Sequence, residues 1–340
     1  MDKQQIARVL EGKHVLVTGG TGSFGKQIVE ELFGYEPACI HVMSRDEKKQ
    51  YDMQQRYAER DRLHFILGDV RDLERTREAV RGKQVVFHAA ALKQVPNCEY
   101  APYEAVLTNV IGAENVRRAA AEAGVEVVVA ISTDKAVKPV NVMGMTKAIQ
   151  ERVILQHDND STGVRFICVR YGNVLGSRGS VVPLFHQRIT QGKPVPITHP
   201  DMTRFLLTIE EAVQLVLWAT VEGENGDLWV RKMPAATVSD IGRAMVNGLT
   251  GGDSYPQEIV GIRPGEKMHE VLVSEEEMWR ATELEEHFVI PTWTKTGRQH
   301  GPTEGAMGEY SSNGARRLSD EELLGLLDSQ GWFSRSRMPD

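Results

Sequence analysis

Two adjacent residues of opposite charge follow a strongly apolar run in the middle of the sequence. The run Val127–Ile131 leads through Ser132 and Thr133 into Asp134 and Lys135. A carboxyl group and an amine that share one cleft can act as a general acid and a general base. Because side chains at adjacent positions diverge, this pair can reach two sides of a short reaction path. The alternative interpretation is a solvated ion pair in a surface turn, since exposed pairs are common and weak.

A glycine-rich turn lies near the start of the chain. Gly19, Gly22 and Gly25 follow the apolar run Val15–Val17 and open a helical pattern that reaches Leu32. Glycine permits a tight turn and lets backbone N–H groups approach a pyrophosphate at the positive end of a helix. A glycine motif alone is weak, but its place between a strand and a helix is what dinucleotide binding requires. We therefore predict a dinucleotide site here, the alternative being an ordinary glycine-rich turn.

The end of the second apolar run bears on the choice of dinucleotide. It carries Ser44, Arg45 and Asp46, with Lys48 and a second lysine one turn later. At this strand end an acidic group holds the ribose of NAD, whereas arginine accommodates the 2′-phosphate of NADP. The cations favour NADP, although Asp46 keeps NAD open and the lysines also suit a solvated helix face. Asp69, at the end of the third run, can accept the adenine amino group.

The elements that must position these residues alternate along the first half of the chain. Apolar runs predict strands at 15–17, 40–43, 65–67, 85–87, 127–131 and 166–169, and helices are predicted at 25–32, from 46, at 103–123 and from 142. Runs of this kind, separated by helices, indicate a parallel sheet covered on both faces. The predicted fold class is α/β, a doubly wound parallel-sheet Rossmann domain with a smaller α/β domain.

The second half is less regular. It predicts a helix at 210–219, strands near 228–230 and 258–260, a long loop at 292–313, and a last helix. Ser319 is the expected N-cap of that last helix, with Glu322 at the capping-box position.

Composition excludes several classes of function. The chain has 340 residues, with 40 Lys and Arg against 47 Asp and Glu, so its formal net charge is −7. A mildly acidic chain lacks the basic face that sequence-independent nucleic-acid binding needs. No run of about 18 apolar residues and no N-terminal signal pattern occur, so we expect a cytoplasmic protein without a membrane span. Three scattered cysteines suit neither a disulfide framework nor a zinc site, and we expect no metal.

Longer motifs narrow the interpretation. They are SRDEKKQ at 44–50, FHAAALKQVP at 87–96, STDKA at 132–136, RYGNVL at 170–175, SRGSV at 177–181 and DMTRF at 201–205. Together they resemble the extended short-chain dehydrogenase/reductase family and, within it, the bacterial UDP-N-acetylglucosamine 4,6-dehydratases of capsule and O-antigen polysaccharide biosynthesis. The resemblance runs from about Gly12 to the last helix. It implies NADP-dependent conversion of UDP-N-acetylglucosamine, or a related UDP-HexNAc, to a UDP-4-keto-6-deoxy-HexNAc. The steps are oxidation at C4, loss of water across C5 and C6, and hydride return to C6.

The chain departs from the general family at the catalytic tyrosine. That family has a tyrosine four residues before a lysine; here Lys147 holds the lysine position and Met143 replaces the tyrosine. A thioether can act neither as an acid nor as a base. Either the protein is an inactive nucleotide-sugar-binding scaffold, or it resembles the active subgroup that carries methionine there. Because the chain shows no membrane span, it is most similar to the members of that subgroup that invert C5.

The resemblance implies a role for each residue near the apolar run 127–131. Asp134 is the acid at the C6 oxygen and Lys135 the base at C5. Thr133, or Asp134 through a water, receives the C4 proton. Because Lys135 must first lose its own proton, we predict that burial and the nearby Lys147 lower its pKa. A UDP-sugar 5,6-dehydratase and a 4-epimerase are the alternative activities.

The resemblance also places residues around the two ligands. Those implied for a tightly bound, recycled NADP are Gly19, Thr21, Gly22, Ser23, Phe24, Gly25, Ser44, Arg45, Lys48, Asp69, Val70, Ala89, Ala90, Ala91, Asn109, Lys147, Tyr171, Asn173 and Val174. Those implied for the UDP-sugar are Lys93, Asn173, Arg178, Val181, Pro196, Thr198, Met202, Arg204, Arg263 and Glu266. Arginine suits a pyrophosphate because its planar fork donates two hydrogen bonds. Each arginine alone would be interpreted as a solvated surface charge.

Domain organisation and assembly follow from the same resemblance. We assign residues 1–174 and 205–232 to the NADP-binding Rossmann domain. Residues 175–204 and 233–340 form the UDP-sugar-binding domain, including the C-terminal loop and helix. The loop at 292–313 is predicted to order over the substrate. The helices at 105–121 and 142–156 are expected to build a homo-oligomer, a dimer or a hexamer, or else only to cover the sheet of one subunit.

Overall fold

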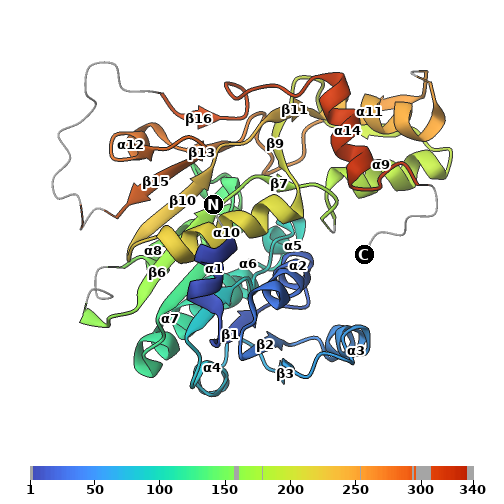
Figure 1. Cartoon of the computed structure of the whole chain (residues 1–340). Helices are drawn as coiled ribbons and strands as arrows, with labels where there is room; N and C mark the ends of the chain where they lie inside the picture. Colours follow the sequence, from blue (N-terminus) through green and yellow to red (C-terminus); the bar gives the residue numbers. More distant parts are fainter. Residues whose placement is uncertain are drawn as a thin grey trace.

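The computed structural model describes residues 3–156, 161–177, 179–252, 254–292, 295 and 308–334. Within these residues a nine-stranded sheet runs through the larger part of the molecule, in the order β14-β15-β10-β6-β5-β4-β1-β2-β3 (Figure 1). Its strands are β14 (Thr282–Glu283), β15 (His287–Pro291), β10 (Asp227–Arg231), β6 (Arg165–Arg170), β5 (Val127–Ile131), β4 (Val85–His88), β1 (His14–Thr18), β2 (Cys39–Ser44) and β3 (Leu63–Leu67). All six strands predicted in the first half of the chain are confirmed.

The sheet is parallel from β3 to β10 and antiparallel at its other edge. β10 pairs in parallel with β6, whereas β15 pairs antiparallel with β10, and β14 with β15. The doubly wound α/β prediction is therefore confirmed, and an antiparallel edge is added to it. Such an edge is common on otherwise parallel sheets.

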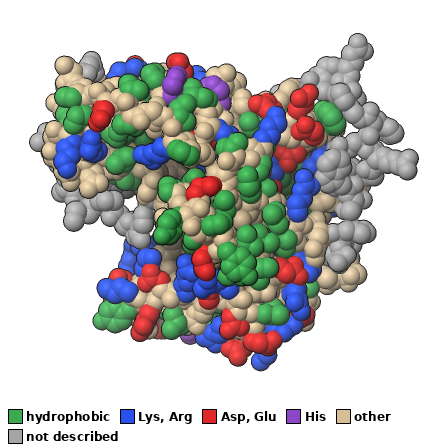
Figure 2. Space-filling model, turned by 180° about the vertical axis from the view of Figure 1, so that it is seen from behind, with side chains coloured by type: hydrophobic (Ala, Val, Ile, Leu, Met, Phe, Trp, Pro, Cys, Tyr) green, Lys and Arg blue, Asp and Glu red, His purple; other side chains and the backbone are tan. Residues whose placement is uncertain are grey.

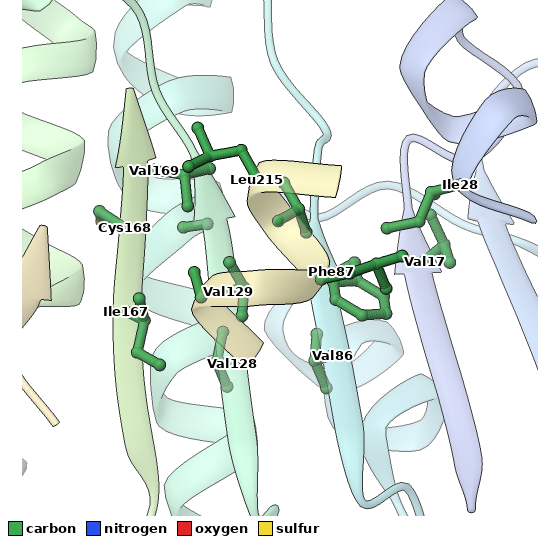
Figure 3. Close-up of a cluster of buried hydrophobic side chains, with 14 of the residues drawn as sticks. Val17, Ile28, Val86, Phe87, Val128, Val129, Ile167, Cys168, Val169 and Leu215 are labelled. Carbon is green, nitrogen blue, oxygen red and sulfur yellow. The ribbon is translucent and has the colours of Figure 1, made fainter. Parts of the chain in front are cut away.

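Helices cover both faces of the sheet, as buried strands require. One face carries α1 (Lys3–Leu10), α2 (Ser23–Leu32) and α10 (Ile209–Glu222), and the other carries α4 (Leu73–Val80), α7 (Gly112–Ala123) and α8 (Val142–Ile154) (Figure 1). α3 (Glu47–Arg56) packs beside β3. Apolar side chains of the central strands fill the core, and Leu215 of α10 lies over the sheet beside Phe87 and Val129 (Figure 3). Burial of these branched side chains is the main force that holds the layers together.

The helix predicted at 103–123 contains an irregular stretch. After α5 (Val95–Tyr100), it consists of α6 (Pro102–Ala105), a π-helical segment (Val106–Ile111) and α7. Single π turns often mark functional sites because the wider turn re-aims its side chains. Here the segment carries Asn109, whose side chain is fully buried.

A second lobe lies above the large sheet in Figure 1 and has its own apolar core. Its helices are α9 (Val181–Thr190), α11 (Val238–Thr250) and α14 (Asp320–Ser329), and its small sheets consist of β11 (Ala235–Thr237), β9 (Thr203–Leu207) and β7 (Asn173–Val174), of β12 (Gln257–Ile259) and β8 (Val195–Ile197), and of β13 (Val271–Val273) and β16 (Tyr310–Ser311). α14 begins with the predicted capping box of Ser319 and Glu322. The predicted domain boundaries stay a proposal, and β15 of the predicted second domain joins the first domain's sheet.

The two lobes are joined by a buried ion-pair network around Arg170. Its guanidinium donates two hydrogen bonds to Glu151 of α8, at 2.7 and 2.6 Å, and two to Glu277, at 2.7 and 2.9 Å. Glu277 belongs to α12 (Glu275–Met278), and Arg170 also donates to the Leu272 carbonyl at 3.1 Å. The arginine thus fixes the end of β6 against the segment that carries β13.

Replacing Arg170 with methionine is expected to lower the free energy of unfolding by about 3–5 kcal/mol, because two buried carboxylates lose their cation. Urea denaturation followed by circular dichroism measures it. The triple variant Arg170→Met, Glu151→Gln, Glu277→Gln removes all three charges and is expected to recover part of the loss. A loss below about 1 kcal/mol in the single variant, the size of a weak surface pair, contradicts the interpretation.

Candidate functional site

The strand order creates a crevice at the carboxyl ends of β1 and β4. β1 lies between β2 and β4, so the connections leave it in opposite directions, and ligands of doubly wound sheets bind at this point. Gly19 follows β1 with a φ of 69°, and a Cβ there would lie 2.7 Å from the backbone nitrogen of Ala90. A Cβ on Gly25 would lie 2.4 Å from the Cα of Gly20. Only glycine fits these two positions, and the turn lies against the backbone that follows β4.

A cavity of about 310 Å³ opens at this crevice. It is lined by eleven residues that the sequence had marked for a ligand: Gly19, Thr21, Gly22, Ser23, Ser44, Arg45, Asp69, Val70, Ala90, Ala91 and Lys93. The cavity is also lined by Asp46 and Lys49, which the sequence had placed where NAD and NADP differ, and by four residues that sequence reasoning missed, Lys26, Met43, Gly68 and Thr108. Most of the missed residues lie one turn or one position from a predicted one. Thr108 comes from the π-helical segment, in which only the neighbouring Asn109 had been marked.

Cations and hydroxyls gather where β2 ends. Thr21 Oγ1 and Ser44 Oγ lie 2.8 Å apart, so the glycine turn and the strand end share a hydrogen bond. Arg45 is half-exposed, with a terminal nitrogen 3.7 Å from the carboxylate of Asp69. Lys49 lines the cavity, and its Nζ lies 2.6 Å from Asp46.

Lys48, the lysine that the sequence had marked, lies outside this cavity. Its Nζ pairs with Asp52 at 2.5 Å on the exposed side of α3. The geometry favours Lys49 in its place, because one residue along a helix turns a side chain by about 100°.

Asp69 is held by a neighbouring arginine. Arg71 donates to its carboxylate from the backbone at 3.0 Å and from Nε at 2.8 Å. Burial alone would raise the pKa of Asp69, but the hydrogen bonds and charge of Arg71, with Arg45, outweigh it and lower that pKa. Asp69 is thus an ionised acceptor at the edge of the cavity.

Other predicted cofactor residues lie outside the cavity. Asn109 bonds to both backbone groups of Leu92, at 2.8 and 3.0 Å, and to Thr146 Oγ1 at 3.0 Å. Asn109 therefore fixes the loop after β4 against α8, and the hydrogen bonds of its side chain are made to other residues of the protein. Phe24 and Tyr171 stack with ring centroids 6.3 Å apart. The remaining residues of this group are Gly25 in the packed turn, Ala89 bonded to the Thr18 carbonyl, Asn173 and Val174 in β7, and Lys147, described below.

The Asp134–Lys135 pair lies in a short 3-10 turn, Asp134–Ala136, directly after β5, the strand next to β4. Thr133 caps this turn, and its Oγ1 donates to Asp134 Oδ1 at 2.8 Å. Lys135 Nζ lies 3.0 Å from the same oxygen. Asp134 is 0% exposed, and its Oδ2 has no hydrogen-bond partner within the described part of the chain. The side chain of Lys135 is 22% exposed, so the pair is largely buried rather than the exposed ion pair of the alternative interpretation.

The structure corrects the prediction about the pKa of Lys135. Burial lowers that pKa, but the carboxylates of Asp134 and Glu270 outweigh it, and the net shift is upward. Glu270 Oε1 lies 3.4 Å from Lys135 Nζ. The sequence could not reveal this contact, because Glu270 is 135 residues away and lies outside the marked motifs. Lys135 is therefore a cation in this structure.

Lys147 and Met143 lie on α8 behind the pair. Lys147 Nζ donates to the Ile131 carbonyl at 2.5 Å and to Gln150 at 2.6 Å, and burial lowers its pKa to about 8. Met143 is buried in a small apolar cluster with Cys98 and does not replace the tyrosine's chemistry. The lowered lysine pKa that we expected at Lys135 is found instead at Lys147.

Gly144 sets how closely α8 approaches the turn at 134–136. A Cβ there would lie 2.2 Å from the Lys135 carbonyl oxygen, well inside van der Waals contact. In an unobstructed helix, Gly→Ala stabilises by about 1 kcal/mol. Glycine at this position lowers the helix propensity of α8, but it allows the helix to contact the backbone of Lys135.

Gly144→Ala is expected to lower turnover about 100-fold, because the helix or the turn must move by roughly 1 Å. Gly325→Ala is the matched control, since this glycine lies in α14 with open space around its Cα, and it is expected to stabilise the fold without changing turnover. Steady-state rates and thermal unfolding of both variants check this. Equal rates in the two would mean that the close approach has no part in the site.

The predicted substrate residues lie mainly in the second lobe. Arg204 is buried and donates to the carbonyls of Thr203 and Lys267, at 2.7 and 3.0 Å, and to Met202 Sδ at 2.9 Å. Thr198 donates to the same sulfur at 3.1 Å.

The others are more dispersed. Arg263 and Glu266 form a loose pair at 3.9 Å on a loop that Asn141 holds through the Gly265 carbonyl at 2.7 Å. Pro196 lies in β8, Val181 begins α9, and Asn173 Oδ1 is buried without a hydrogen-bond partner in the described chain. Arg178 and most of the predicted 292–313 loop lie outside the described residues.

Comparison with known proteins identifies the family. A family profile described as "Polysaccharide biosynthesis protein" matches residues 15–292, which include the glycine turn after β1 and the turn at 134–136. The chain belongs to this family. A UDP-glucose 4-epimerase of Rickettsia canadensis is 43% identical over 327 residues, covering 93% of this chain and 95% of that protein. A Methanocaldococcus jannaschii protein named as an uncharacterized membrane protein is 41% identical over 331 residues, covering 95% of this chain and 98% of that protein.

Solved structures share the family's architecture. The structure of Pen from Bacillus thuringiensis matches with a TM-score of 0.88 at 35% identity, covering 95% of this chain and 99% of that one. The dTDP-glucose 4,6-dehydratase DesIV of Streptomyces venezuelae, with NAD and TYD bound, matches with a TM-score of 0.68 at 21% identity, over 75% of this chain and 86% of that one. The match to DesIV shows that the two chains share a fold. Every helix in the described ranges is too short or too polar to cross a membrane.

Proposed function

We propose that this protein is an NADP-dependent UDP-N-acetylglucosamine 4,6-dehydratase of bacterial surface-polysaccharide or related sugar biosynthesis. The observation that carries the proposal is the buried Asp134–Lys135 pair, one strand away from the dinucleotide crevice. Elimination of water needs an acid at C6 and a base at C5, and this pair offers a carboxyl group and an amine 3.0 Å apart. UDP-N-acetylglucosamine itself is proposed on the sequence motifs.

The residues of the crevice fit a nicotinamide dinucleotide. Gly19 lets the turn lie against the backbone of Ala90, where a side chain would not fit, and the start of α2 offers backbone donors to a pyrophosphate. Ser44, Arg45 and Lys49 lie where a 2′-phosphate would need cations and hydroxyls, which supports NADP over NAD. When bound, the cofactor supplies a hydride acceptor for C4 and a hydride donor for C6.

The hydrogen bond from Thr133 to Asp134 suggests how protons move without the missing tyrosine. Thr133 Oγ1 receives the C4 hydroxyl proton while passing its own proton to Asp134 Oδ1, 2.8 Å away. Asp134 is then a carboxylic acid and protonates the departing C6 hydroxyl. Lys135, once it has lost its proton to solvent, removes the proton from C5, exchanges hydrogen with solvent, and delivers a proton to C5 after the hydride reaches C6. Met143 has no part in this sequence.

A 4-epimerase is the second candidate, because the Rickettsia relatives are named UDP-glucose 4-epimerase. Epimerisation also oxidises C4, but it needs neither an acid at C6 nor a base at C5. A buried Asp–Lys pair, stabilised by a third charged residue, is costly to keep in a site that does not use it. The pair therefore favours dehydration.

We also propose a homo-oligomer in the cytoplasm. Hydrophobic side chains are exposed on the face of the molecule seen in Figure 2. On α5 to α8 the large exposed apolar residues are Tyr100, Tyr103, Ile111, Met145 and Ile149. Patches of this kind mark interaction surfaces, and these helices are the ones predicted to pair between subunits. Light scattering coupled to size-exclusion chromatography measures the mass; a monomer would contradict this part of the proposal.

Product analysis tests the proposed activity. Purified protein is incubated with UDP-N-acetylglucosamine and, separately, with UDP-glucose, and the sugars are followed by proton NMR. Dehydration gives a new C6 methyl doublet and loss of the C4 proton. Epimerisation keeps the C4 proton and changes its couplings, which would reject the dehydratase in favour of the second candidate. Tight cofactor binding without turnover of either sugar would support the inactive scaffold.

A further inference from the structure

Glu270 brings a third buried charge to the catalytic pair from the other lobe. It lies directly before β13 and is 2% exposed. Its backbone is fixed on both sides by Ser312, whose Oγ accepts from Glu270 N at 2.9 Å and whose N donates to Glu270 O at 2.8 Å. Ser312 Oγ also lies 2.7 Å from Thr203 Oγ1. The backbone that carries this carboxylate is therefore held in place by the pairing of β13 with β16.

The carboxylate of Glu270 bridges two lysines. Oε1 lies 3.4 Å from Lys135 Nζ, and Oε2 lies 3.8 Å from Lys267 Nζ. Lys267 in turn donates to the Val137 carbonyl at 2.5 Å, just after the catalytic turn. Glu270 Oε2 has no hydrogen-bond partner among the residues that the structure describes. The 3.4 Å contact thus brings the Glu270 carboxylate directly against the Lys135 ammonium.

Four charged groups surround Lys135. Asp134 faces it from its own turn, Glu270 from the start of β13, Arg204 from β9, and Lys267 through Glu270. Arg204 directs its guanidinium at backbone carbonyls and Met202, so it does not replace a carboxylate partner. Because Asp134 also accepts from Thr133, its charge is shared between two donors. A buried ammonium needs more compensation than one shared carboxylate oxygen supplies, and Glu270 provides it.

We propose that Glu270 is a positioning residue that fixes the Lys135 ammonium and sets the pH at which Lys135 becomes a base. The catalytic consequence rests on the proposed function, because it requires Lys135 to act at C5. The electrostatic coupling between the two residues does not rest on it. In this arrangement the second lobe controls the proton affinity of a residue that belongs to the Rossmann half.

The coupling is tested without any substrate. Wild type, Glu270→Gln, Glu270→Asp and Glu283→Gln are labelled with trace acetic anhydride across a pH series, and the peptide containing Lys135 is quantified by mass spectrometry. Glu283→Gln is the matched control, since Glu283 pairs with Lys232 at 2.6 Å at the far sheet edge. The labelling midpoint of Lys135 is expected to fall by about one pH unit or more in Glu270→Gln, because a close carboxylate no longer favours the cation. Glu270→Asp keeps the charge and is expected to lie nearer to wild type, and the control to equal it.

The catalytic consequence is tested by the pH dependence of kcat for the sugar that wild type converts. Its ascending limb is expected to move to lower pH in Glu270→Gln by the same amount as the labelling midpoint, and to be largely restored in Glu270→Asp. An unchanged labelling midpoint in Glu270→Gln overturns the inference, whatever the rates do. A shifted midpoint with an unshifted rate profile overturns the catalytic role. If wild type converts neither UDP-sugar, the proposed function fails, and the labelling still decides the coupling. Circular dichroism of each variant excludes misfolding as the cause.

Discussion

The double variant Asp134→Asn, Lys135→Met is expected to lower the rate of 4,6-dehydration by about 10³-fold or more while the protein stays folded and binds its cofactor. General acid and base groups contribute about 10²–10⁴-fold each, and the two act on one elimination. Both residues are removed together because a single change would leave a buried charge without its partner, at a cost to stability. Asparagine and methionine keep roughly the shapes of the original side chains, so the turn at 134–136 is preserved.

Single variants and a distant control complete this test. Asp134→Asn and Lys135→Met alone are each expected to lose nearly as much rate as the double variant, because residues that act on one step are not additive. Lys232→Met removes a lysine from an ion pair with Glu283 at the far sheet edge and is expected to keep the wild-type rate. A double variant that retains more than about a tenth of the wild-type rate would remove this pair from the mechanism.

Gly19→Ala is expected to raise the dissociation constant for NADP by about 100-fold, which corresponds to about 2.7 kcal/mol. The added Cβ would lie 2.7 Å from the backbone nitrogen of Ala90, so the floor of the crevice must move. The left-handed φ of 69° adds strain of about 1–2 kcal/mol. Isothermal titration of NADP and of NAD into the protein measures both affinities, and tighter binding of NADP in wild type tests the role of Arg45 and Lys49.

Gly82→Ala separates the two effects at Gly19. Gly82 has a similar φ of 73°, but no atom lies within 4 Å of the Cβ that alanine would add. It therefore carries the backbone strain without the clash. Gly82→Ala is expected to lose stability and to keep its affinity for NADP. If Gly19→Ala behaved in the same way, the crevice at β1 and β4 would not be where the cofactor binds.

The Rossmann half could be predicted because its signals are local. Its central strands are apolar, β-branched runs such as Val127–Ile131, and parallel strands of this kind are buried on both faces. The glycine turn is equally local, since its positive φ and close contacts are encoded by the glycines themselves. The capping box at Ser319 and Glu322 was found for the same reason.

What could not be predicted depends on contacts between distant segments. β15 pairs antiparallel with β10, about 60 residues earlier in the chain. Its short apolar run does not indicate whether the strand pairs in a parallel or an antiparallel direction. The amphipathic α1 was missed because two buried residues, Ile6 and Leu10, are too few for a clear pattern. The pKa of Lys135 was predicted in the wrong direction because Glu270, which reverses the shift, is not visible from the sequence around position 135.

The measurement that tests the central claim most directly is NMR of the wild-type protein with UDP-N-acetylglucosamine in deuterated water, without added cofactor. If Lys135 removes the C5 proton during elimination, the product carries a C6 methyl group and deuterium at C5, and the C5 couplings report retention or inversion. No NADPH accumulates, because the hydride returns to the same sugar. A converted sugar that keeps protium at C5 and its C6 hydroxyl would contradict dehydration by this pair.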